Sequence, residues 1–201
     1  MEKQNEQLQK MRHTMSHVLA GAIKALYGED VKFGIGPAID TGFYYDFDMQ
    51  KSLTPDDFAK IENKMHEIVN KKLPMTKEVV SREKALKMFE GQPYKQELIR
   101  ELDDSAEISV YRLGDVFCDL CKGPHVENTS ELKNFAFKIN KLAGAYWRGK
   151  EKNKMMQRIY VFGFASKAEL DEYITMYTEA QKRDHRKIGK ELGLFFFSDY
   201  A

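Results

Sequence analysis

The chain has 201 residues, of which 42% are hydrophobic and 31% are charged. Its 32 lysines and arginines nearly balance 31 aspartates and glutamates, so the net charge of +1 excludes the bulk attraction of a strongly basic domain for nucleic acid. No run approaches the ~20 apolar residues of a membrane span, and the polar N-terminus lacks the apolar core of a signal peptide. Two cysteines do not form a disulfide framework, which predicts a reducing, cytoplasmic setting.

The N-terminal quarter changes from helical to extended patterning. Apolar residues at spacings of three and four predict a helix from residue 2 to about residue 27, which Gly28 would end. Glycines and a proline then interrupt the chain. Phe43, Tyr45 and Phe47 alternate with more polar positions, which predicts a half-buried strand.

The middle of the chain predicts an α+β fold. Thr54 as a cap and Pro55 at the first helical position begin a second helix, with a buried face made of Phe58, Ile61, Met65, Ile68 and Val69. A strand at 75–80 and a helix at 81–89 follow, and further strands are predicted at 108–113, 135–142 and 156–164. Several strands are neighbours without an intervening helix, so we expect an antiparallel sheet packed with helices.

The C-terminal segment predicts a long linker helix. Ser166 and Glu169 have the spacing of a capping box, and the helix would continue to about residue 192 with charge on most faces. Such a helix usually bridges to another part of a protein. The apolar ending at 193–201 has the pattern of the first strand of a further domain.

Two short motifs supply the side chains most suited to chemistry. His13 and His17 are four residues apart on the first helix, so both imidazoles project from one face. Cys121 and His125 are also four apart, with a Gly-Pro turn between them. Three histidines and a cysteine suit either a tetrahedral zinc site or an acid–base pocket, and the motifs alone leave both open. Asp119 precedes Cys121 by two residues and would face the same side of a strand.

Other polar motifs have simpler explanations. The spacing of Cys118 and Cys121 also fits a redox pair, but no helix-opening pattern follows it, and Cys118 is better explained as a small buried hydrophobe. Trp147 beside Arg148 is interpreted as a buried anchor, with a phosphate or base contact as the alternative. The basic run at 182–187 is typical of a solvated face that could also touch an RNA backbone. Lys95 has no distinctive pattern, and His66 and His185 receive no role.

Six short motifs occur in a fixed order along the chain. They are His13-x-x-x-His17, Gly34-Ile-Gly-Pro, Gly42-Phe-Tyr-Tyr-Asp46, Asp119-Leu-Cys-Lys-Gly-Pro-His125, Gly144-Ala-Tyr-Trp-Arg148 and Lys182-Arg-Asp-His-Arg-Lys-Ile-Gly189. With these motifs, the chain closely resembles the second N-terminal, editing domain of bacterial threonyl-tRNA synthetases from about residue 12 to residue 201. A related domain occurs in alanyl-tRNA synthetases and in free-standing deacylases, and the motif at 182–189 selects the threonyl branch.

The resemblance implies a domain organisation. We expect a polar lead-in at 1–11, the editing domain at 12–165, the linker helix at 166–192 and, at 193–201, the start of a truncated aminoacylation domain. The ubiquitin-like domain that usually comes first and the aminoacylation core are expected in a longer parent. The parent, a homodimer by resemblance, would use ATP, magnesium and zinc to ligate threonine to tRNA(Thr), whereas this fragment would have no ligase activity.

The resemblance also implies a reaction, which is hydrolysis of the ester in mischarged Ser-tRNA(Thr). His13 and Lys95 would handle the water and the leaving group. His17, Cys121 and His125 would line the pocket. Tyr45 and Asp119 would bind the serine hydroxyl and amine. The partner would be the acceptor end of tRNA(Thr) carrying serine, with no membrane involved.

The role of a metal stays open at this stage. The threonyl branch implies editing without a cofactor, whereas the alanyl branch uses the equivalent of His13, His17, Cys121 and His125 as zinc ligands. One alternative is therefore a zinc-dependent, alanyl-type deacylase acting in trans. The other is a non-catalytic tRNA-binding module in which the cluster serves only the fold. A metalloprotease is disfavoured because the histidine pair lacks the glutamate of the H-E-x-x-H motif.

Overall fold

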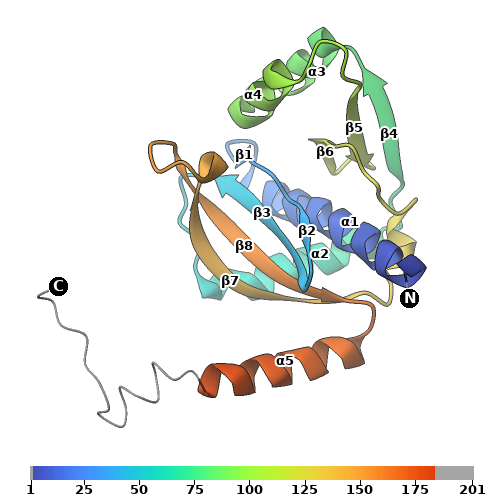
Figure 1. The fold of residues 1–201 in the computed structure, drawn as a ribbon, viewed down its shortest axis with the longest axis vertical. Coiled ribbons are helices and arrows are strands. Elements are labelled where there is room, and N and C mark those ends of the chain that lie inside the picture. Colours follow the sequence, from blue (N-terminus) through green and yellow to red (C-terminus); the bar gives the residue numbers. More distant parts are fainter. Residues whose placement is uncertain (1, 184–201) are drawn as a thin grey trace, which may run out of the picture.

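The computed structural model describes residues 2–183 and has the predicted α+β architecture (Figure 1). The strands are all antiparallel and form two separate sheets, a division that the sequence patterns did not show. The expectations for residues 184–192 and 193–201, for His185 and for most of the basic run lie outside the described residues.

The larger sheet has five strands in the order β1–β3–β8–β7, with β2 also paired to β3. Phe43, Tyr45 and Phe47 of β3 are each 0% exposed, which confirms the predicted inward face of this strand. The bounds are β1 Lys32–Phe33, β2 Ala38–Ile39, β3 Gly42–Asp48, β7 Ala136–Tyr146 and β8 Met155–Phe164.

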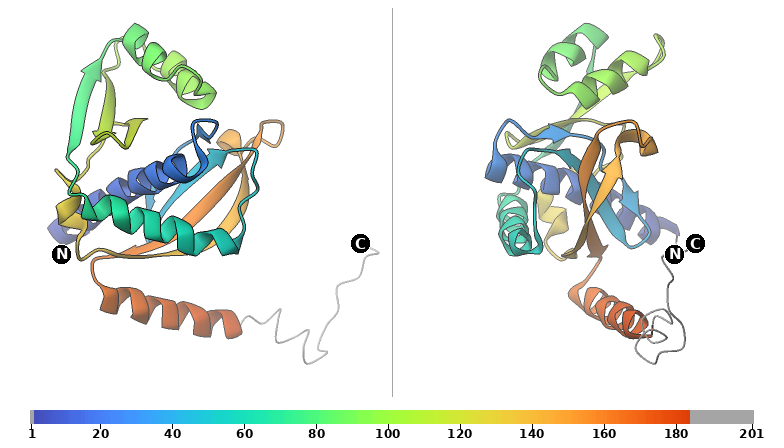
Figure 2. Two further views of the ribbon diagram at one scale, coloured as in Figure 1. Left: turned by 180° about the vertical axis from the view of Figure 1, so that it is seen from behind. Right: turned by 90° about the vertical axis from the view of Figure 1, so that its left-hand side faces the viewer.

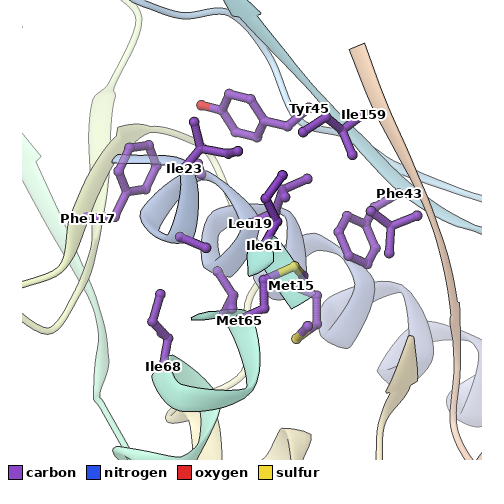
Figure 3. Close-up of a cluster of buried hydrophobic side chains, with 14 of the residues drawn as sticks. Met15, Leu19, Ile23, Phe43, Tyr45, Ile61, Met65, Ile68, Phe117 and Ile159 are labelled. Carbon is purple, nitrogen blue, oxygen red and sulfur yellow. The ribbon is translucent and has the colours of Figure 1, made fainter. Parts of the chain in front are cut away.

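Two helices pack against the inner face of this sheet (Figure 2). Helix α1, Glu2–Tyr27, has the predicted length and ends at Gly28, whose φ of +87° suits glycine. Helix α2, Phe58–Asn70, follows a 3₁₀ turn at Pro55–Asp57, so the predicted second helix begins as a tighter turn. Apolar side chains of both helices meet those of β3 and β8 in the main core (Figure 3): Met15, Leu19, Ile23, Phe43, Ile61, Met65 and Ile159.

The smaller sheet and two helices form a second lobe at one end of the molecule (Figure 1). Its strands are β4 Met75–Val80, β5 Ile108–Leu113 and β6 Phe117–Leu120, and it packs against α3 Arg82–Met88 and α4 Pro93–Glu101. Strand β6 and helix α4 were not predicted, although Pro93 at the first helical position is a usable signal for α4.

Helix α5, Lys167–Lys182, begins at the predicted cap, where the Ser166 hydroxyl accepts a hydrogen bond from the Glu169 backbone N–H at 3.3 Å. Tyr173 and Tyr177 contact Phe162 of the larger sheet with ring centroids 5.1 and 5.2 Å apart. These contacts pack one side of the helix onto the face of β8 opposite to the core residue Val161, because neighbouring residues of a strand point to opposite faces. None of the helices in the described part of the chain is long and apolar enough to cross a membrane.

Candidate functional site

The two histidines of α1 lie one turn apart and differ in depth. His17 is 2% exposed, whereas His13, nearer the N-terminus, is only partly buried. Their ring centroids are 5.5 Å apart. The i, i+4 spacing thus places both imidazoles on one face of the helix, as predicted.

Strand β6 lies between the two cores and faces both. Phe117 and Asp119 are buried on the side of α1, whereas Cys118 and Leu120 pack against the core of the smaller sheet. Cys118 and Asp119 therefore point to opposite faces, as alternation along a strand requires. Cys118 is half-buried and packs against apolar side chains of the smaller sheet, in keeping with its interpretation as a small hydrophobic residue.

The turn after β6 brings the second motif onto α1. The Cys121 sulfur lies 3.3 Å from His13 Nε2 and 3.2 Å from His125 Nε2. The His13 and His125 rings are stacked with centroids 4.1 Å apart. Gly123 permits this turn because its φ is +75° and because a side chain there would meet the Tyr111 hydroxyl. The two halves of the predicted constellation therefore converge.

A second, deeper group of polar side chains adjoins the histidines. The Tyr45 hydroxyl donates to Asp119 Oδ2 at 2.6 Å, and Lys95 Nζ donates to the Tyr45 hydroxyl at 3.1 Å. Lys95 also forms an ion pair with Asp119 Oδ1. Asp119 links this group to the histidines, because His17 Nε2 lies 3.8 Å from Asp119 Oδ2. Lys95, Tyr45 and Asp119 are all nearly or fully buried.

Burial sets the protonation of the cluster. Desolvation lowers the pKa of His13, and it lowers the pKa values of His17 and His125 further. The proximity of the other histidines opposes a positive charge on His17 or His125, and Lys95 adds to this effect at His17. Desolvation also raises the pKa of the Cys121 thiol to about 11. The site near pH 7 therefore contains neutral imidazoles and a protonated thiol.

Helix α4 positions Lys95 and is itself held from two sides. Gln92, just before the helix, accepts from the Phe33 backbone N–H at 2.9 Å and donates to the Val31 carbonyl at 3.0 Å. Trp147, 5% exposed, donates through Nε1 to Glu97 of α4 at 3.1 Å. Trp147 is thus the buried anchor that the sequence suggested.

The four side chains of the two motifs fit the chemistry of a zinc site. Their ligand atoms all lie within 4.8 Å of one another, whereas donors in a tetrahedral zinc site are about 3.3–3.6 Å apart. Binding would require a contraction of ~1 Å at the widest pair. His17 Nδ1 is buried without a hydrogen-bond partner among the described residues, and such an atom is available as a ligand. His13, His17, Cys121 and His125 are the residues that would hold zinc.

Two cavities adjoin residues of the site. One, of about 260 Å³, is lined by Lys95, Phe33 and Phe117, and the other, of about 190 Å³, by Cys121, Ser109 and Leu120. His13, His17 and His125 line neither of these two cavities. The side chains of His13, Cys121 and His125 contact one another directly, so a substrate serine would bind beside them or move them apart.

Sequence reasoning missed one polar residue that belongs to the cluster. Thr14 is 0% exposed, and its hydroxyl lies 3.1 Å from His125 Nδ1. Its position between His13 and His17 in the sequence was the available signal. A threonine inside a helix attracts little notice, however, because its hydroxyl commonly bonds back to its own helix.

Comparison with known proteins assigns the chain to a family. Residues 108–160 match the family model of the threonyl and alanyl tRNA synthetase second additional domain, the segment that contains Asp119, Cys121 and His125. Threonine–tRNA ligase of Clostridium acetobutylicum is 56% identical over 187 residues, which cover 92% of this chain and 29% of that protein. The corresponding protein of Dehalococcoides mccartyi is 53% identical over 188 residues (94% and 31%), and that of Halalkalibacterium halodurans is 51% identical over 197 residues (96% and 30%).

The chain therefore spans about a third of the length of the curated relatives it matches. Each of these alignments spans more than nine-tenths of the chain. By these matches, the chain belongs to the threonine–tRNA ligase family of bacterial type and corresponds to the part that contains the second additional, editing domain.

Proposed function

We propose that this chain is an aminoacyl-tRNA deacylase that hydrolyses the ester joining serine to the terminal ribose of tRNA(Thr). In the whole protein, it would act beside a core that uses ATP to attach threonine to the same tRNA in the cytoplasm. The family assignment and the converging histidines, cysteine and buried lysine support this proposal.

The physical need for such a reaction follows from the size difference between the two amino acids. Serine has the hydroxyl of threonine and lacks only a methyl group. One missing methyl group in a pocket provides only about 1–3 kcal/mol of discrimination. A synthetase for threonine will therefore attach serine at times, and a second site that admits only the smaller side chain removes the error.

His13 is proposed to take a proton from the attacking water, and Lys95 to stabilise the leaving group. His13 Nδ1 lies 3.1 Å from the Pro124 carbonyl, which only accepts, so Nδ1 carries the hydrogen and Nε2 keeps a lone pair. A neutral imidazole with a free Nε2 can take a proton from water. Lys95, which donates to Tyr45, has the ammonium hydrogens needed to stabilise the departing ribose oxygen.

The remaining residues of the site would bind the substrate. His17, Cys121 and His125 are proposed to line the pocket, and Tyr45 and Asp119 to bind the serine hydroxyl and amine. In the structure both Asp119 oxygens already contact Lys95 or Tyr45, so a bound amine would share this carboxylate. The pKa of about 11 keeps Cys121 a thiol near pH 7, which supports attack by water over a covalent intermediate.

A second candidate is a zinc-dependent deacylase of the alanyl type. The observation that favours it is the clustering of four donor atoms within 4.8 Å. A bound zinc ion would supply Lewis-acid activation of the ester or of a water molecule. Under this alternative the chain's own His13, His17, Cys121 and His125 would serve as ligands, and Lys95 and Asp119 would still position the substrate.

The experiment that tests the proposal is deacylation of Ser-tRNA(Thr), with Thr-tRNA(Thr) and Ser-tRNA(Ala) as competing substrates. We expect selective release of serine from tRNA(Thr) and a loss of at least 100-fold in kcat/KM for His13→Ala. Preincubation with a chelator and metal analysis of the protein decide between the two candidates, since only the zinc-dependent one predicts loss of activity on chelation.

Matched control variants distinguish a loss of the proposed site from a general effect of substituting a histidine or a cysteine. His66→Ala removes an exposed histidine of α2, and Cys118→Ser changes the cysteine that faces the other core. Both should keep most of the deacylase activity. Wild-type rates for both His13→Ala and Cys121→Ala would contradict the proposed site. Release of serine no faster than without protein would favour a non-catalytic tRNA-binding module.

A further inference from the structure

Thr14 has three polar neighbours at a single buried hydroxyl. Its Oγ1 lies 2.9 Å from the Lys10 carbonyl oxygen and 3.2 Å from the Val126 backbone nitrogen, in addition to the 3.1 Å contact with His125 Nδ1. The side chain is fully buried, so no solvent competes for these contacts. This hydroxyl connects α1 to the Cys121–His125 turn.

The hydrogen-bonding capacity of these groups determines which atom donates. A carbonyl oxygen only accepts and a backbone N–H only donates, whereas a hydroxyl has one hydrogen and two lone pairs. The shortest contact, to the Lys10 carbonyl, requires the threonine hydrogen. Val126 N–H occupies one lone pair, so the other must accept a hydrogen from His125 Nδ1.

We propose that Thr14 is a positioning residue that fixes His125 as the tautomer protonated on Nδ1, so that a bare Nε2 faces the Cys121 sulfur. His13 presents its Nε2 in the same way, with the Pro124 carbonyl in the place of the threonine hydroxyl. The thiol, with one hydrogen, therefore lies between two acceptor nitrogens at 3.3 and 3.2 Å. The centre of the cluster is rich in lone pairs and suited to an electropositive group, whether the hydrogen of a water molecule or a cation.

The tautomer of His125 depends on the side chain at position 14. The partner of His13 is backbone and cannot be removed by substitution, whereas the partner of His125 is a side chain next to His13 in the sequence. Residue 14 can therefore set the orientation of a histidine 111 positions away. Outer-shell partners of this kind orient the histidines of metal and acid–base sites.

The test measures the tautomer directly by nitrogen NMR of the chain labelled with nitrogen-15 histidine. The chain has five histidines, and His125→Gln identifies the ring signals of His125 by their loss. We expect a protonated Nδ1 and a bare Nε2 in the unchanged protein and in Thr14→Ser. In Thr14→Val, which keeps the shape and removes the acceptor, we expect the hydrogen to move wholly or partly to Nε2.

Two results would overturn the inference. One is a hydrogen on His125 Nε2 in the unchanged protein, and the other is an unaltered tautomer in Thr14→Val. If Thr14→Val does not fold, Thr14→Ala removes the same acceptor with less crowding and is measured in its place.

A kinetic measurement adds a second readout, which rests on the proposed function. Deacylation of Ser-tRNA(Thr) should fall about 10-fold in Thr14→Val, the lower end of the range for losing an orienting partner, and recover in Thr14→Ser. Absence of deacylation in the unchanged protein would refute the proposed function alone, because the tautomer is measured without substrate.

Discussion

At the scale of single residues, the most consequential pair is Lys95 and Asp119, a salt bridge with both side chains no more than 4% exposed. A buried charge is tolerated only when it is paired and hydrogen-bonded. Tyr45 completes the pairing by bonding to both partners. The pair is thus a stability requirement as well as a proposed part of the catalytic site.

Removing the lysine should expose this requirement. We expect Lys95→Met to lower the free energy of unfolding by about 3–5 kcal/mol, because Asp119 is left as an uncompensated buried charge. Adding Asp119→Asn should restore part of the loss, since the amide is neutral and still accepts from Tyr45. Urea denaturation of both single variants and the double variant measures this coupling. If the two single losses simply add, the ion pair has no such role.

At the scale of elements, α4 decides whether Lys95 reaches the site. The helix has nine residues and its own contacts with the smaller sheet, but it is tied to the larger sheet as well. Trp147 and Arg148, in the turn between β7 and β8, bind Glu97 through its side-chain oxygens. The ring of Trp147 also lies 4.8 Å from that of Tyr94. The β7–β8 turn thus holds the helix that carries the lysine.

Removing the contacts of Trp147 should increase local opening of α4 more than unfolding of the whole protein. We expect Trp147→Ala to reduce the amide hydrogen-exchange protection of residues 93–101 and to cost about 3–5 kcal/mol of stability. Trp147→Phe, which keeps one aromatic ring but loses the hydrogen bond to Glu97 and part of the buried ring area, should cost less, about 1–3 kcal/mol. Unchanged protection of these amides in Trp147→Ala would show that α4 is held by the smaller sheet alone.

At the scale of the whole molecule, the site lies where two lobes with separate cores meet. Helix α1 belongs to the larger lobe and β6 to the smaller one, and the two approach closely at Gly21. A Cβ at this position would lie 2.9 Å from Val116 Cγ1 and 3.4 Å from Phe117 Cβ. The missing side chain therefore allows the distance between His17 and Asp119 to be short.

Substitution at Gly21 tests this close approach. Gly21→Ala should be nearly neutral, because the gain of about 1 kcal/mol in helix propensity offsets a shift of one Val116 methyl group. Gly21→Val adds branches that must displace Val116 and Phe117, so we expect a loss of about 1–3 kcal/mol and a larger fall in deacylation than in stability. Thermal unfolding and deacylation rates measure the two effects. Equal stability and equal deacylation rates of the two variants would argue against the close contact between Gly21 and Val116.

Several features of this protein follow from the amino-acid sequence alone. The helix at 2–27, the end at Gly28 and the strand at 42–48 follow local rules, namely the spacing of apolar residues and the turn preferences of glycine. The pairs His13–His17 and Cys121–His125 could also be identified as candidate site residues, because both spacings are short. The resemblance to the editing domain of the threonyl-tRNA synthetases, based on these motifs, is confirmed by the comparisons.

Only the tertiary structure decided how these pieces combine. The division of the strands into two sheets depends on pairings such as Val110 with Leu120, which no local pattern specifies. The burial of Lys95 depends on α4 being held between two lobes, and the contact between Thr14 and His125 joins positions 111 residues apart. Local propensity acts over a few residues, whereas the site is made by contacts across the chain that exist only when both cores are packed.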